Sequence, residues 1–85
     1  MRIEFKRRFR KDYAKAPDSV RKAFEDRIFV FKRNRYDKSL NNHGLKGDFS
    51  SLRSINITGD YRALFTDDGD VVSFIILKNH SNLYR

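Results

Sequence analysis

The spacing of apolar residues changes near the middle of the chain, and this change limits the possible fold more than any other feature. In the first half, Val20, Phe24, Ile28 and Phe31 recur at the spacing of one face of a helix. In the second half the apolar period becomes two, which is typical of strands. A helical first half and a strand-rich second half predict an α+β fold, with helices packed on one face of a sheet.

The first half is expected to hold a short strand and a helical hairpin. Residues 1–5 alternate between apolar and charged side chains, as a strand does. Residues 6–17 carry apolar side chains at helical spacing and end at a proline, which breaks a helix. The second helix is expected over residues 18–34, with Asp18 or Ser19 as its N-cap.

The second half is expected to hold a loop and an antiparallel meander. Periodicity is lost over residues 34–51, where Asn, Gly and Ser accumulate, and this favours a long functional loop. Three strands are then expected, over residues 52–57, 61–66 and 71–78. The sequence DDGD at 67–70 predicts a tight hairpin turn. The last strand is apolar on both faces, which predicts a central position covered on both sides.

These elements predict one domain over residues 1–85, in which an N-terminal strand and a two-helix hairpin pack on an antiparallel sheet of about four strands. The helices are expected on one sheet face. The other face, with the loop and the C-terminal residues, is left to form a shallow concave surface.

The charge of the chain is concentrated in its first half. Residues 1–36 hold thirteen Lys and Arg against five Asp and Glu, whereas residues 37–85 hold six of each. Such a field favours a polyanionic partner, which is nucleic acid, an acidic membrane surface or an acidic protein. A solvated helix face kept soluble by Lys and Arg is the structural alternative.

The cysteine and histidine content restricts the chemistry. The chain has no cysteine and two histidines, so disulfides and thiolate metal sites are excluded and a four-ligand zinc site is not expected. No metal or cofactor is therefore expected. The longest apolar run, residues 74–77, is far shorter than the roughly 20 residues of a membrane span, and the N-terminus lacks the apolar core of a signal peptide. We expect a cytoplasmic protein with no membrane partner.

Three short strings occur in a specific order. HGLKG (43–47) lies in the loop, RSINITGDYRALF (53–65) spans the first hairpin of the meander, and HSNLY (80–84) follows the last strand. With the order of the elements, they resemble the RelE/ParE superfamily of bacterial toxins, most closely its YafQ-like branch. The resemblance covers essentially the whole chain and is strongest from Asn42 to Tyr84.

The resemblance implies the toxin of a type II toxin–antitoxin system, acting as a ribosome-dependent mRNA endoribonuclease (an mRNA interferase). The implied partners are the ribosome with its mRNA and rRNA, and a cognate antitoxin that silences the toxin in a higher-order assembly. Position by position, the resemblance assigns function to His43, Asp60, His80 and Tyr84. Two positions depart from the pattern of the branch. Asn56 stands where a histidine near the loop is common, and Ile76 stands where a catalytic arginine is expected.

Metal-free cleavage of RNA uses the ribose 2′-hydroxyl as the nucleophile. The protein must then remove the 2′ proton, stabilise the charged phosphorane and protonate the 5′ leaving oxygen. Histidine suits proton transfer because its unperturbed pKa of about 6.5 lies near neutral pH. His80 is the candidate acid, Asp60 is expected to orient a histidine or to act as the base, and His43 belongs to the same site.

Substrate binding is assigned to cations and to one aromatic residue. Lys78, Arg62 and Arg53 are candidate phosphate ligands, and either arginine could supply the cation missing at position 76. Tyr84 is expected to stack a base or position its phosphate. Ribosomal RNA is expected to contact the exposed cations of the first helix, which are Lys6, Arg7, Arg8, Arg10 and Lys11.

Each assignment has a structural alternative. A histidine at a strand end accounts for His80, ordinary turn chemistry for His43 and Asp60, and cross-strand pairing for the two arginines. Tyr84 could cap the core with its ring. Two other functions also stay open, which are a ParE-like toxin that inhibits DNA gyrase and an RNA-binding member of the fold whose catalysis is weakened.

Overall fold

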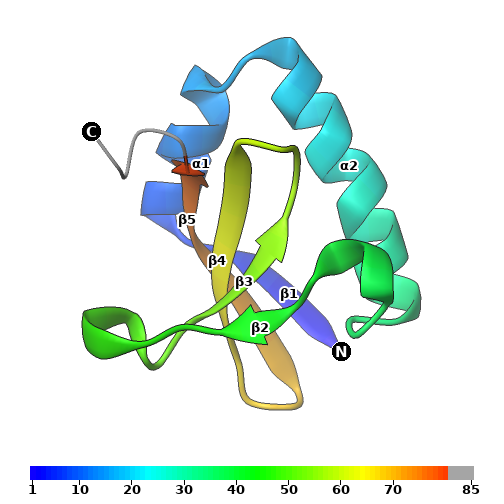
Figure 1. Ribbon diagram of the computed structural model, residues 1–85, viewed down its shortest axis with the longest axis vertical. Coiled ribbons are helices and arrows are strands. Elements are labelled where there is room, and N and C mark those ends of the chain that lie inside the picture. Colours follow the sequence, from blue (N-terminus) through cyan, green and yellow to red (C-terminus); the bar gives the residue numbers. More distant parts are fainter. Residues whose placement is uncertain (81–85) are drawn as a thin grey trace.

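The computed structural model describes residues 1–80, and its elements follow the predicted order (Figure 1). The first half contains β1 (Arg2–Phe5), α1 (Arg7–Lys15) and α2 (Asp18–Arg33). The second half contains two 3-10 turns, η1 (Lys38–Leu40) and η2 (Gly47–Phe49), and four strands, which are β2 (His43–Gly44), β3 (Arg53–Asn56), β4 (Tyr61–Asp67) and β5 (Val71–Asn79).

The sheet differs from the prediction at both of its edges. It has five strands in the order β1-β5-β4-β3-β2, rather than about four. The meander of β3, β4 and β5 is antiparallel as predicted, but β1 pairs with β5 in parallel, with Arg2 opposite Val71. Parallel neighbours need a long crossover connection, and the helical hairpin begins the one between β1 and β5. The extra strand, β2, lies within the segment expected to be an unpaired loop.

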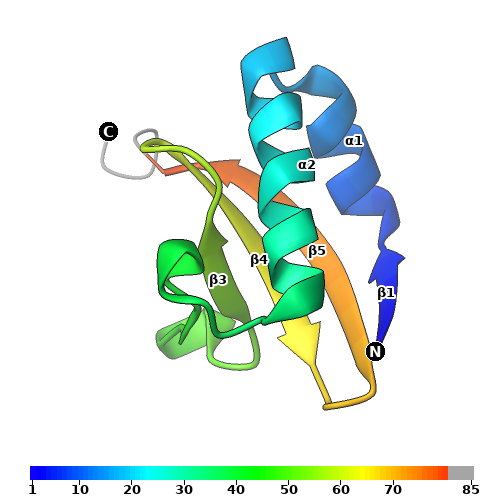
Figure 2. The same ribbon diagram turned by 90° about the vertical axis from the view of Figure 1, so that its right-hand side faces the viewer.

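The helices cover one face of the sheet, as predicted (Figures 1 and 2). Between the helices and the sheet lies an aromatic core. Phe74 of β5 lies at its centre, with ring centroids 5.5 Å from Phe24, 5.6 Å from Phe31 and 5.3 Å from Phe65. The predicted stripe of α2 is therefore the face that packs on β4 and β5. Such ring pairs add stabilisation beyond the burial of their area.

The start of α2 differs from the predicted cap. Pro17 is the N-cap residue and no side chain caps the helix, so the assignment to Asp18 or Ser19 is wrong by one or two positions. The Pro17 carbonyl accepts the N–H groups of Val20 and Arg21. Asp18 instead lies in the first turn, where its carboxylate pairs with the Arg21 guanidinium. The fixed φ of proline makes Pro17 suited to this junction.

The second face of β5 is only partly covered, contrary to the prediction. A bulge between the pairs Leu64–Ile76 and Phe65–Phe74 leaves Ile75 as an extra residue. Phe65 and Phe74 point to the helices, so Leu64 and Ile76 lie on the opposite face, which no helix covers. We refer to this face as the open face.

The last part of β5 is attached to α1 by a carboxylate. β1 ends opposite Phe74, so the N–H of Leu77 has no β1 partner. It donates instead to Oδ2 of Asp12, at 3.1 Å. Asp12 therefore holds the segment that leads to Lys78 and His80.

Within residues 1–80, neither helix has the length and apolarity needed to cross a bilayer.

Candidate functional site

A pocket of about 200 Å³ lies on the open face, where β2, β3 and β4, the end of β5 and the loop after β2 meet. Five of its lining side chains are cationic or titratable, and they are His43, Lys46, Arg62, Lys78 and His80. Its remaining walls come from Leu45, Phe49, Ser54 and Leu64. The fold thus brings together four of the residues predicted from sequence, from parts of the chain up to 37 residues apart (43 to 80).

His43 reaches the pocket because the short strand β2 fixes which way its side chain points. It is the register partner of Ser54, and paired residues share a sheet face. Its Nδ1 lies 2.7 Å from the backbone carbonyl oxygen of Asn41. A carbonyl only accepts, so in the neutral ring Nδ1 carries the proton and Nε2 holds the free lone pair. This tautomer makes the exposed His43 a proton acceptor at Nε2.

His80 is fixed through its backbone at the end of β5. Its N–H donates to the backbone carbonyl of Asp60 in the β3–β4 turn. The Thr58 hydroxyl accepts the N–H groups of Asp60 and Tyr61, at 3.2 and 3.1 Å, which keeps this turn closed. Asp60 therefore positions His80 by its main chain, and its exposed carboxylate is not part of the pocket wall.

Arg62 and Lys78 form a cationic pair on the open face. They are register partners in the β4–β5 ladder. Arg62 is oriented by its Nη1, which donates to the carbonyls of Thr58 at 2.8 Å and Gly59 at 3.2 Å. The Nζ of Lys78 lies over the ring of Phe49, 5.2 Å from its centroid. Within residues 1–80 neither cation has an ion-pair partner.

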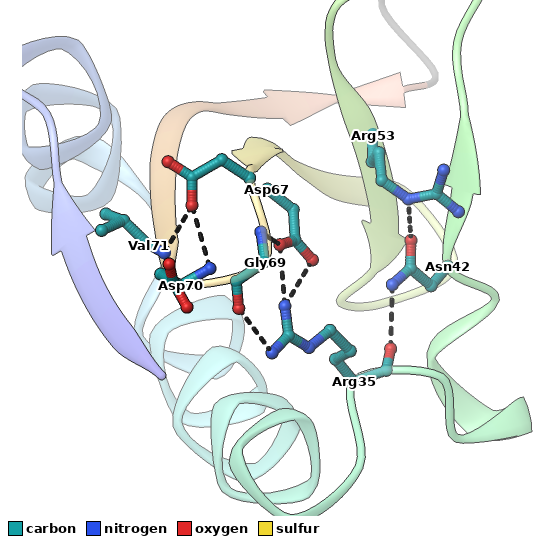
Figure 3. Close-up of polar contacts among 8 residues, drawn as sticks. Arg35, Asn42, Arg53, Asp67, Gly69, Asp70 and Val71 are labelled. Atoms are coloured by element: carbon teal, nitrogen blue, oxygen red, sulfur yellow. Dashed lines mark hydrogen bonds and ion pairs between the residues drawn. The ribbon is translucent and has the colours of Figure 1, made fainter.

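Arg53 lies on the other side of the sheet and does not reach the pocket. Strand alternation places it on the face of Ile55, and its Nε donates to Oδ1 of Asn42 at 2.8 Å. The Asn42 amide in turn donates to the carbonyl of Arg35, at 2.9 Å. Arg53 is therefore part of the attachment of the loop that carries His43 (Figure 3).

The same attachment contains an ion pair between Arg35 and Asp67 (Figure 3). Nη1 of Arg35 lies 2.7 Å from both carboxylate oxygens of Asp67, whose side chain is 5% exposed. Burial raises the pKa of Asp67, but hydrogen bonds from Arg35 and the Gly69 N–H, with the charges of Arg35 and Arg53, outweigh it. The net result is a pKa below the ordinary carboxyl value.

The two departures from the toxin pattern both lie on the open face. Ile76 is the register partner of Leu64, one step along the strands from the pair of Arg62 and Lys78. Asn56 is the register partner of Arg62, and its Oδ1 is buried without a hydrogen-bond partner among residues 1–80. No cluster of three metal-ligating side chains occurs in the same range.

The predicted cations of the first helix lie outside the pocket. The five cations at the start of the first helix, Lys6, Arg7, Arg8, Arg10 and Lys11, are exposed. Arg8 pairs with Asp12, and Arg10 donates to the carbonyl of Phe5. Tyr84 lies outside the described residues.

Sequence reasoning did not identify Phe49 and Lys46, which line the pocket from the loop after β2. A large aromatic residue in a loop rich in Asn, Gly and Ser was the available signal for Phe49. Phe49 is 41% exposed, although a phenylalanine is usually buried.

No family model matches the chain, and no curated protein matches it. Several solved structures match the chain. The structure of YafQ from E. coli strain BL21(DE3) superposes with a TM-score of 0.80 at 16% identity, over 100% of both chains. The YoeB/ParE toxin from Agrobacterium tumefaciens gives a TM-score of 0.75 at 21% identity, over 94% of this chain and 99% of that one. The RelB-RelE antitoxin-toxin complex from Methanococcus jannaschii gives a TM-score of 0.75 at 22% identity, over 95% of this chain and 94% of that one.

These likenesses extend over nearly the full length of each chain, and they agree with the resemblance drawn from the sequence strings. At these identities they establish the architecture. The chain has the α+β fold of the RelE/ParE-like toxins, with YafQ among its structural neighbours.

Proposed function

We propose that this chain is the toxin of a type II toxin–antitoxin system and an endoribonuclease that cuts mRNA on the ribosome. The observation that carries the proposal is the convergence on one pocket of the open face of two imidazoles and two cations that have no ion-pair partner among residues 1–80. Proton transfer and phosphate binding are the two requirements of RNA cleavage through the 2′-hydroxyl.

In the proposed reaction, the 2′ oxygen attacks the adjacent phosphorus while the bond from phosphorus to the 5′ oxygen breaks. Nε2 of His43 takes the 2′ proton, since its Nδ1 is committed to Asn41. His80, in its protonated form, gives a proton to the leaving 5′ oxygen. The products are a 2′,3′-cyclic phosphate and a free 5′-hydroxyl, and solvent restores both histidines. No metal takes part in these steps.

Arg62 and Lys78 are proposed to stabilise the phosphorane. An arginine presents several donors in one plane, which matches phosphate oxygens, and a lysine acts as a point charge. Arg62 thus takes the part that the toxin pattern gives to an arginine at position 76. Asp60 acts on His80 through the turn rather than as the base, and Tyr84 keeps its proposed role in stacking or positioning the substrate.

The partners follow from the same proposal. The exposed cations of α1 are proposed to contact phosphates of ribosomal RNA, which gives affinity without sequence selectivity. A cognate antitoxin is the second partner. The RelB-RelE structure, an antitoxin-toxin complex with this fold, supports that part, and we extend it to a higher-order assembly in the cytoplasm.

One observation favours a second candidate, an RNA-binding member of the fold with weakened catalysis. Ile76 adds an apolar side chain next to Leu64 where the pattern has a cation. Arg53 cannot replace that cation because it points to the other face. Stabilisation of the phosphorane therefore falls on Arg62 and Lys78 alone among the cations proposed from sequence for this role.

Controlled expression in bacteria tests the proposal, with wild type compared to the double variant His43→Ala/His80→Ala. Arrested translation with messages that end in 2′,3′-cyclic phosphates, seen only with wild type, supports it. Toxicity with intact messages and a replication block identifies a gyrase inhibitor instead. Ribosome association with neither toxicity nor cleavage identifies the binding-only member.

A further inference from the structure

The aromatic ring of Phe49 gives the candidate site a second element besides its proton donors and cations. We infer that Phe49 is the platform on which one unpaired RNA base stacks beside the scissile phosphate. Phe49 is then a residue that contributes to the choice of the nucleotides that are cut. This inference rests on the proposed function and names part of its substrate recognition.

Phe49 is held in place by the backbone of its own loop. The loop is closed at its base by the bond from the Leu45 N–H to the Leu52 carbonyl, at 3.1 Å. The Leu52 N–H then donates to the carbonyl of Phe49, at 2.8 Å. Gly47 has a φ of 66°, in the left-handed region, and permits the 3-10 turn that ends at Phe49. The ring is therefore presented by a short closed loop and not by a free segment.

The surroundings of the ring suit a nucleotide more than a protein core. Leu45 and Leu64 provide apolar contacts, while His43, Arg62 and Lys78 lie around the same pocket. A nucleotide has the matching parts, an apolar flat base linked to a charged phosphate. Unpaired bases stack on aromatic side chains in many RNA-binding modules.

Lys78 links the platform to the phosphate. In the protein alone its ammonium lies over the Phe49 ring, 5.2 Å from the centroid. A cation over an exposed ring is a weak contact. When a base stacks on the ring, the Lys78 ammonium can move to the phosphate beside Arg62, which is the register partner of Lys78. The exchange loses a weak contact and gains base stacking and a charge-assisted hydrogen bond.

Two consequences follow for selectivity. A base inside a double helix cannot lie on the ring, so paired RNA is a poor substrate. Purines offer a larger face than pyrimidines and are held more strongly by stacking. The preference is modest, because stacking on an aromatic face tolerates every base.

The chain offers a matched control in Phe29. Phe29 is 63% exposed, and the guanidinium carbon of Arg33 lies over its ring, 5.8 Å from the centroid. Phe29 therefore shares exposure and a cationic neighbour with Phe49, but it lies on α2, away from both histidines. Phe29→Ala removes an equivalent side chain outside the site.

The test uses short single-stranded oligoribonucleotides with 2-aminopurine at one position and a 2′-O-methyl group that blocks cleavage. Stacking quenches the fluorescence of this base. Binding is measured with the oligonucleotide free and as the message in the vacant A site of a ribosome. The proteins are wild type, Phe49→Ala, Phe49→Leu, Phe49→Trp and Phe29→Ala.

We expect quenching with wild type, Phe49→Trp and Phe29→Ala, and not with Phe49→Ala. Phe49→Leu keeps apolar bulk without an aromatic face and is expected to bind on the order of tenfold more weakly than wild type. Equal quenching by Phe49→Ala and wild type overturns the inference while leaving the proposed function intact. Wild type that binds neither form of the RNA overturns both.

Discussion

Arg62 and Lys78 stand directly opposite each other on the open face of the sheet, with no carboxylate paired to either among residues 1–80. Like charges at such cross-strand positions destabilise a sheet. By contrast, Arg8 is paired with Asp12 and Arg35 with Asp67. The uncompensated pair is understandable if an anion, which we propose is the scissile phosphate, completes it.

Removing one of these cations is expected to separate stability from activity. Lys78→Met keeps the length of the side chain and removes the repulsion, so the free energy of unfolding is expected to rise by about 0.5 kcal/mol. RNA binding is expected to weaken, with the slope of log K against log salt reduced by about 0.7 for the lost phosphate contact. Chemical denaturation and salt titration measure the two effects. The exposed Lys22 on α2 provides the control, Lys22→Met.

The side chains of the two histidines are expected to contribute to the rate of RNA cleavage and not to the stability of the fold. His43→Ala and His80→Ala are each expected to lower the rate of cleavage by about 10²- to 10⁴-fold, the usual effect of losing a general acid or base. His43 is exposed, so the melting temperature of His43→Ala is expected to stay near that of wild type. Single-turnover rates measured against pH provide the check. Loss of one limb of a bell-shaped profile in each variant supports the assignments, and an unchanged profile rejects them.

The ion pair of Arg35 and Asp67 is expected to stabilise the domain. Asp67→Asn removes a buried charge-assisted hydrogen bond, so the free energy of unfolding near pH 7 is expected to fall by about 2 kcal/mol. The melting temperature should fall by roughly 10 °C. Asp70→Asn is a matched control, because Asp70 is exposed on the same hairpin and its carboxylate has no hydrogen bond among the described residues.

The stability difference between wild type and Asp67→Asn is also expected to depend on pH. The pKa of Asp67 in the folded protein lies below its ordinary value of 3.8. A carboxyl group with a lowered folded pKa stabilises the fold above its unfolded pKa and loses this effect as the pH falls through the folded pKa. The difference should therefore be constant near neutral pH and shrink below pH 3.8. Urea unfolding across this range would contradict the account if the difference did not change.

The cations of α1 are expected to provide affinity for the ribosome. Lys6, Arg7 and Lys11 have no side-chain hydrogen bond or ion pair among residues 1–80, so the triple change to Glu leaves the contacts of Arg8 and Arg10 in place. Association with ribosomes should weaken and its salt dependence should flatten. Sedimentation at several salt concentrations measures both. Unaltered sedimentation of the triple variant would identify these residues as a solvated helix face.

The elements that depend on local patterns were predictable from sequence. The spacing of Val20, Phe24, Ile28 and Phe31 identified the core face of α2. Three of these residues are buried, and Ile28 is partly buried against the core. The DDGD turn was identified by its glycine, and Gly69 has a φ of 97°. In both cases the signal lies in neighbouring residues, which local geometry controls directly.

The features that depend on distant pairing were not predictable in this way. β2 has two residues, too few to show alternation, yet its register with β3 decides that His43 faces the pocket. The face of Arg53 depends on the same register, which is why two arginines that were equivalent in sequence have different surroundings. The parallel pairing of β1 joins segments from opposite ends of the described chain, and no local pattern reports it.

The position of β5 between β1 and β4 has a consequence for biosynthesis. This strand is translated after every other described element, and Phe74 within it completes the packing of Phe24, Phe31 and Phe65. A nascent chain that lacks β5 leaves these rings without their common partner and contains neither Lys78 nor His80. The domain therefore has to fold after most of it has been translated, and the candidate site on a nascent chain is not assembled until β5 has left the exit tunnel.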